Sequence, residues 1–129
     1  MGFSKFEDIG AWQRAYELKL QVLAICDRPS FSNDPKLRSQ LVDAARSGPR
    51  NIAEGFARWH HRDFARFTRI AKASEVELLN HFIEAFDSRH ITQGERAKLE
   101  HAARKAIKAA NGLIRYLRTT RTWNENTAH

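Results

Sequence analysis

Six polar residues have the types and the spacing to do chemistry inside a helical protein. Four of them follow one another at intervals of four, three and four residues, which places them along one side of a helix. These four are Ser47, Asn51, Glu54 and Arg58, and Ser74 and Glu77 hold comparable places on the next helix. Burial raises the pKa of a carboxyl group, so Glu54 or Glu77 would be able to act as a general acid or base if the two helices meet.

The same residues also fit a purely structural role. Buried polar groups that satisfy one another fix the register of packed helices, and no side chain of nucleophile type is placed near Glu54 or Glu77. We therefore favour a structural polar network and predict no enzymatic activity. The members of this network are Ser47, Asn51, Glu54, Arg58, Ser74 and Glu77.

Basic residues are concentrated in one stretch of a chain that carries a formal charge of +7. Residues 46–72 contain seven basic and two acidic residues, whereas residues 73–87 contain four acidic residues and no Lys or Arg. Aromatic rings among arginines can stack on unpaired bases while the guanidinium groups hold phosphates. The predicted nucleic-acid contacts are Arg46, Arg50, Arg58, Trp59, His60, Arg62, Arg66 and Arg69, with Arg104 and Lys108 on the fourth helix.

Two other interpretations of this charge stay open. The basic residues could form a solvated surface without a specific partner, or they could dock an acidic protein, such as a subunit of a nucleic-acid enzyme. Single-stranded or looped RNA is the partner that the mixture of arginines and aromatic rings favours.

Other kinds of site find no support in the sequence. The six histidines show no metal-ligand spacing, so we predict no metal site, and the Gly-rich loop that holds nucleotide phosphates is absent, so we predict no cofactor. Cys26 ends an apolar stripe and is predicted to be a small core residue. It cannot form an internal disulfide, which fits a reducing compartment, and we expect the cytoplasm.

Helices must position these residues, because only six Gly and three Pro are present and apolar residues recur with helical spacing. We predict a first helix over 8–27 capped by Asp8, and a second that starts at Asp34–Pro35 and has a kink, or else a break, at Pro49. A tight connection over 59–62 leads to a third helix that ends near residue 89. A Thr-x-x-Glu capping box at Thr92 starts a fourth helix that runs to about residue 120.

The fold that follows is an all-α, antiparallel up-down-up-down four-helix bundle. The 129 residues suit a single domain over 1–120 with an irregular tail over 121–129, and no stretch is apolar enough to cross a membrane. The first helix has two adjacent apolar stripes, wider than a surface helix needs. Such width indicates either deep burial or contact with a second subunit.

One segment carries a family resemblance. The run Asn51-Ile52-Ala53-Glu54-Gly55 resembles the four-helix-bundle family of the ribosomal RNA intervening-sequence protein. The residues that extend the resemblance over most of the first 90 positions are Phe6, Trp12, Gln40, Leu41, Arg58, Phe67, Ala71, Ser74 and Glu77. Gly48 and Ala73 depart from the family, which usually has Val or Ile at the first position and commonly Gly at the second.

The resemblance implies an antiparallel bundle that assembles as a ring-shaped homopentamer without a known catalytic activity. Related bundles include accessory variability proteins of diversity-generating retroelements, which work with a reverse transcriptase and nucleic acid. We therefore predict a non-enzymatic, basic bundle that self-associates and binds nucleic acid, with RNA as the first choice.

Overall fold

The computed structural model describes residues 3–58 and 60–119, and within those ranges all regular secondary structure is helical. The long helices are α1 (Gly10–Cys26), α2 (Pro35–Phe56), α3 (His61–Asp87) and α4 (Gln93–Thr119). The predicted all-α class is therefore confirmed. The predicted tail over 121–129, the expected helix end at residue 120 and Trp59 lie outside the described residues. None of the described helices is long and apolar enough to cross a membrane.

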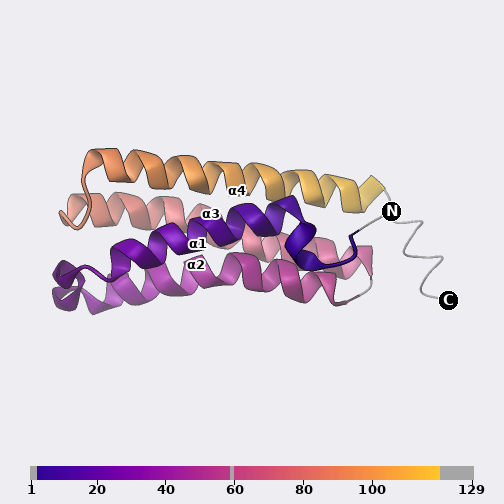
Figure 1. Ribbon diagram of the computed structural model, residues 1–129, viewed down its shortest axis with the longest axis horizontal. Coiled ribbons are helices and arrows are strands. Elements are labelled where there is room, and N and C mark those ends of the chain that lie inside the picture. The colour runs from indigo at the N-terminus through magenta and orange to yellow at the C-terminus, as the bar shows by residue number, and fades with distance from the viewer. Residues whose placement is uncertain (1–2, 59, 120–129) are drawn as a thin grey trace.

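The four long helices lie side by side along one axis (Figure 1). α2 packs on α3 and α1, and α4 packs on α3 and α1, so the order around the bundle is α1, α2, α3, α4. The α1–α2 and α3–α4 connections lie at one end of the bundle, and the α2–α3 connection lies at the other (Figure 1). Helices that share one core in this way form a bundle.

The start of α1 differs from the prediction. Asp8 does not cap this helix, because it ends a short 3-10 helix, Phe6–Asp8, and Ile9 holds the N-cap position without a side-chain hydrogen bond. The Asp8 carboxylate instead accepts a long hydrogen bond, 3.4 Å, from the hydroxyl of Ser4. Ile9 is buried in the core. Burial of an apolar side chain thus decides where α1 begins, in place of the expected polar cap.

The connection between α2 and α3 is shifted relative to the prediction. It spans residues 57–60, and His61 and Arg62 already belong to the first turn of α3. The side chain of His61, the first residue of α3, is buried. At its other end α3 stops at Asp87, and Arg89 adopts the left-handed conformation with a φ of 65°, which ends the helical path before the expected residue 89.

The predicted capping box of α4 is confirmed. The backbone N–H of Thr92 donates to Glu95 Oε1 at 2.8 Å, and the backbone N–H of Glu95 donates to Thr92 Oγ1 at 3.1 Å. Glu95 also forms an ion pair with Arg28, which lies in the α1–α2 connection. The Arg28 guanidinium, followed by the Thr92 N–H, lowers the pKa of the Glu95 carboxyl to about 2.

Asp34 occupies the N-cap position of α2 before Pro35, as predicted, but its side chain makes no cap hydrogen bond. Its Oδ2 lies 3.0 Å from Nε2 of His90, and Nδ1 of His90 lies 2.9 Å from the Ser30 hydroxyl. The His90 ring also stacks on Phe31, with a centroid distance of 4.1 Å. His90 therefore ties the two connections at this end of the bundle together.

Pro49 lies inside α2, which continues unbroken from Pro35 to Phe56. The break that was the alternative at this position is therefore wrong. The predicted kink stays a prediction. Pro49 is buried, so packing offsets the one hydrogen bond that its missing N–H costs the helix.

Two apolar clusters fill the bundle, one at each end. The first contains Leu18, Leu41, Leu78 and Phe82, with Cys26 among its members as predicted, and burial raises the pKa of the Cys26 thiol to about 11. The second is built on Ile9, Ala15, Ile52, Phe64, Ala71, Leu113 and Leu117. Each long helix contributes one of its halves to the first cluster and the other half to the second. A belt of other residues therefore separates the two clusters near the middle of the bundle.

The two apolar stripes of α1 have different surroundings. Ala15, Leu18, Val22 and Ile25 are buried in the bundle. Members of the other stripe, Trp12, Tyr16 and Leu23, are only partly buried, and Leu20 is 50% exposed. The width of the apolar face therefore exceeds what the bundle itself covers.

Gly55 allows α2 and α3 to approach each other closely near their connection. A Cβ at this position would lie 2.8 Å from Cδ1 of Phe64 and 2.9 Å from Cβ of Phe67, both shorter than real contacts. Gly112, inside α4, would meet nothing within 4 Å.

Substitution of these two glycines should have opposite effects. Gly55→Ala is expected to lower the free energy of unfolding by about 1–2 kcal/mol, because overpacking outweighs the gain in helix propensity. Gly112→Ala, the matched control, should raise it by about 1 kcal/mol. Urea unfolding followed by circular dichroism measures both values, and a stabilised Gly55→Ala protein would contradict the close approach.

Candidate nucleic-acid interface

Five of the predicted nucleic-acid contacts lie on or beside the α2–α3 connection. Arg58 and His60 lie in the connection itself, and Arg62, Arg66 and Arg69 follow on α3 at intervals of four and three residues, which places them along one side of the helix. All five side chains are exposed. We call this set, Arg58, His60, Arg62, Arg66 and Arg69, the α2–α3 basic surface. Trp59 belongs to the same stretch of sequence but lies outside the described residues.

An aromatic ring joins two members of this surface. The guanidinium carbon of Arg58 lies 5.0 Å from the centroid of the Phe67 ring, and that of Arg66 lies 4.6 Å from it. Arg58 also donates from Nε to Glu54 Oε2 at 3.2 Å. Phe67 therefore holds two cations close together at the end of the bundle, and only one of them has an acidic partner among the described residues.

Arg46 and Arg50 lie elsewhere, further along α2. They line a shallow groove of about 360 Å³ between α1 and α2, together with aromatic residues of the N-terminal part of the chain. We call this the α1–α2 groove and define it by Phe6, Trp12, Tyr16, Lys19, Arg46 and Arg50. The prediction treated these arginines and the α2–α3 basic surface as one patch, whereas the structure places them in two surroundings.

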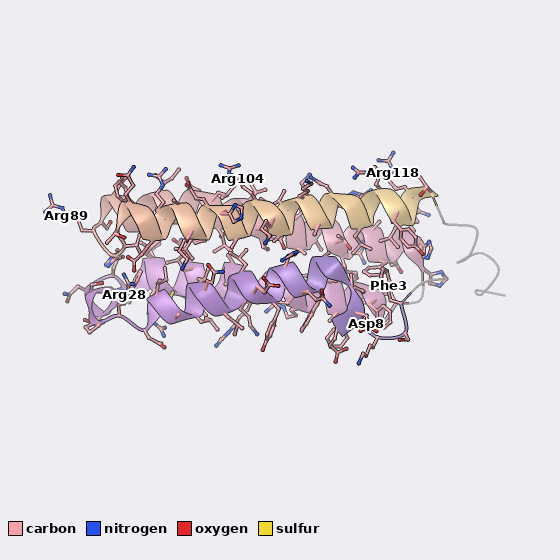
Figure 2. The ribbon with its side chains drawn as sticks, turned by 45° about the horizontal axis from the view of Figure 1, so that its top comes forward. Phe3, Asp8, Arg28, Arg89, Arg104 and Arg118 are labelled. Carbon is pink, nitrogen blue, oxygen red and sulfur yellow. The ribbon has the colours of Figure 1, made fainter. Side chains whose placement is uncertain are left out.

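Arg104 and Lys108 lie on α4, which packs beside α3 and α1. Both side chains are exposed, and Figure 2 shows Arg104 on the outer side of its helix, pointing away from the bundle. Their spacing of four residues puts them on one side of α4. They therefore add charge on a helix next to α3.

The six residues of the predicted polar network form three separate groups. The Ser74 hydroxyl donates to Ser47 Oγ at 2.7 Å, and the Asn51 amide donates to Ser47 Oγ at 2.9 Å, so these three residues link α2 to α3. Glu54 pairs with Arg58, as described above. Glu77 lies 2.9 Å from Nε2 of His81 on its own helix.

The carboxyl groups that were considered as a general acid or base are not buried. The side chains of Glu54 and Glu77 are 51% and 54% exposed. The burial that such a role was expected to use is therefore absent at both positions. The hydrogen-bonded group of Ser47, Asn51 and Ser74 fixes the register between α2 and α3.

Among the residues that the structure describes, Glu75 has a buried carboxyl group, and it was not one of the predicted site residues. Its side chain is only 1% exposed, and neither carboxylate oxygen has a hydrogen-bond partner among the described residues. Desolvation by burial raises its pKa to about 8. A signal was present, because Ala71, Leu78 and Phe82 place position 75 on the core side of α3 by helical spacing.

Within the described residues, no three His, Cys, Asp or Glu side chains are grouped as they would be around a metal ion. The α2–α3 basic surface and the α1–α2 groove each combine cationic side chains with aromatic rings. Such a combination can hold phosphates and carboxylates.

A family model described as the 23S rRNA-intervening sequence protein matches residues 7–112. The chain belongs to this family. The match covers most of the chain, including the whole of α1, α2 and α3, and confirms the resemblance seen in the sequence. No curated protein matches the chain.

Gly48, one of the two departures from the intervening-sequence family, has a structural explanation. A Cβ at this position would lie 3.3 Å from Cβ of Ala15 and 3.4 Å from Oε2 of Glu75. The branched residue that is usual in the family would need space that the buried carboxyl group occupies here. Gly48 and Glu75 therefore form one packing unit in the belt between the two apolar clusters.

Proposed function

We propose that this chain is a non-enzymatic, antiparallel up-down-up-down bundle that self-associates and binds nucleic acid, in the first place RNA. Membership of a family described by an intervening sequence of 23S rRNA supports RNA as the partner. The α2–α3 basic surface makes the principal contacts. Arg104 and Lys108 on the neighbouring α4 extend it.

The observation that carries this proposal is the arrangement of arginines around Phe67. Two guanidinium groups lie within 5.0 Å of the ring centroid, and Arg62 and Arg69 stand exposed on the same helix. Guanidinium groups bind phosphate oxygens in a fixed, forked geometry. Unpaired bases can stack on aromatic or guanidinium planes, which favours single-stranded or looped RNA over a regular duplex.

Self-association would strengthen such a surface. The affinity of a few phosphate contacts is modest, but copies held in one assembly, such as the homopentamer that the family resemblance implies, engage the same RNA together. The exposed part of the α1 apolar face supports an assembly of this kind.

Phosphate contacts predict a strong dependence of binding on salt. Binding of a labelled single-stranded RNA, followed by fluorescence anisotropy, should weaken linearly on a log–log plot against salt concentration, with a slope of about −0.7 for each phosphate contact. Binding at low salt with a steep negative slope is the expected result. A flat slope, or no binding at low salt, would overturn the proposal.

A further inference from the structure

The aromatic residues of the α1–α2 groove pack on one another and beside a lysine. Phe6 packs edge-to-face with Trp12 at a centroid distance of 5.3 Å, and Trp12 and Tyr16 are stacked at 4.8 Å. Nζ of Lys19 lies 4.5 Å from the centroid of the Tyr16 ring. These contacts cover at least one face of the Trp12 ring and one face of the Tyr16 ring. The charged residues that the structure describes along the groove are Lys19, Arg46 and Arg50.

The groove is consequently electropositive. Lys19, Arg46 and Arg50 place three positive charges along it, and no acidic residue lines it within the part of the chain that the structure describes. A base would have to displace Lys19 to stack on Tyr16, whereas a surface of carboxylates and aliphatic side chains would fit the groove as it stands.

A surface of that description exists on the outer side of α3. Residues 73–87 contain no Lys or Arg, and the exposed residues of this part of α3 include Val76 and Ile83, 47% and 40% exposed. Glu77 and Glu84 are exposed too. Val76 and Ile83 are two helical turns apart, and so are Glu77 and Glu84. An aliphatic stripe and an acidic stripe therefore run side by side along α3. We call Val76, Glu77, Ile83 and Glu84 the α3 acidic face.

We infer that the α1–α2 groove of one copy of this chain binds the α3 acidic face of a second copy. In this contact the carboxylates of Glu77 and Glu84 face Lys19, Arg46 and Arg50, and the aliphatic side chains of Val76 and Ile83 cover Leu20 and the aromatic residues of α1. The two surfaces cannot meet within one chain, since the groove opens between α1 and α2 while α3 packs behind α2 (Figure 1). This inference rests on the self-association in the proposed function and names the surfaces that produce it.

The contact is head to tail, because the two surfaces differ. Each bound copy leaves one groove and one acidic face free, so further copies add until the assembly closes into a ring or continues as a chain. Arg46 and Arg50 are then covered by a neighbouring copy. The α2–α3 basic surface, which is made of other residues, stays open to RNA.

Charge reversal on both surfaces tests this contact. Glu77→Arg with Glu84→Arg makes both surfaces of a copy positive, and Arg46→Glu with Arg50→Glu makes the groove lose its positive character. Each double variant alone should fall to the mass of the monomer, 14.9 kDa, in size exclusion with light scattering. An equimolar mixture of the two should regain a multimeric mass, because each variant then finds a complementary partner.

A control variant, Glu17→Arg with Asp27→Arg, reverses two exposed acids away from both surfaces and should keep the wild-type mass. The inference is overturned if the double variants keep the wild-type mass, or if the mixture stays monomeric while circular dichroism shows both variants folded. If either result is found while the wild type is multimeric, the chain self-associates through other surfaces. If the wild type itself is monomeric, both this contact and the proposed self-association are wrong.

Discussion

Glu75→Gln will stabilise the folded protein by an amount that grows as the pH rises. In the folded protein the pKa of Glu75 is about 8, against an ordinary value of 4.5. Between these two values the folded state keeps a proton that the unfolded state has released, so the stability of the wild type falls as the pH increases. The loss is complete above about pH 8.

The expected size of this effect is large. The contribution of Glu75 to the free energy of unfolding should fall by about 3 kcal/mol between pH 4.5 and 7, and by about 5 kcal/mol in total from well below pH 4.5 to well above pH 8. Glutamine has the same shape and does not ionise, so the Glu75→Gln protein escapes this loss. Near pH 4.5 the two proteins should differ little, because the carboxyl group is then protonated in the folded state.

Urea unfolding at pH 5, 7 and 9 measures the difference between the two proteins. Glu17→Gln, at an exposed position of α1 away from both association surfaces, is the control and should follow the wild type at every pH. If the Glu75→Gln curve also runs parallel to that of the wild type, the Glu75 carboxyl group is not held in a desolvated site.

Neutralising Arg62, Arg66 and Arg69 together will weaken RNA binding by about 100-fold at 0.1 M salt. Each phosphate contact multiplies the affinity by the salt concentration to the power of about −0.7, which is about fivefold at 0.1 M. Three such contacts together contribute roughly two orders of magnitude in affinity. Glutamine removes the positive charge and leaves a shorter, polar side chain that suits a helix. Arg58 is left unchanged because it also pairs with Glu54.

The control removes the same charge from other places. Lys36→Gln, Lys98→Gln and Lys105→Gln lower the net charge equally, at exposed positions outside the α2–α3 basic surface. This variant should bind RNA much more tightly than the arginine variant. Equal losses in the two variants would mean that net charge, and not the α2–α3 basic surface, holds the RNA.

The helices were predictable because their signals are local. The spacing of Leu37 and Leu41 on α2, or of Leu78 and Phe82 on α3, indicates which side of the helix is buried. The capping box at Thr92 indicates a helix start from four consecutive residues. Asp8 failed as a cap for a reason that is not local. The burial of Ile9 depends on the helices packed around it.

The surfaces were harder to predict, because they combine residues from different helices. Nothing in the sequence states that Arg46 and Arg50 face the aromatic residues of α1, some 30 positions earlier, while Arg58 and Arg66 meet over Phe67. Glu75 was overlooked because charged residues are seldom fully buried, even though its spacing placed it in the core. The room that Gly48 leaves for it becomes visible only when α1, α2 and α3 are packed together.

The most direct measurement is the slope of log affinity against log salt concentration, compared between the wild type and the Arg62→Gln, Arg66→Gln, Arg69→Gln protein. Loss of three phosphate contacts should make the slope shallower by about 2. The lysine control should keep the wild-type slope. Identical slopes for the wild type and the arginine variant would contradict the assignment of RNA binding to the α2–α3 basic surface.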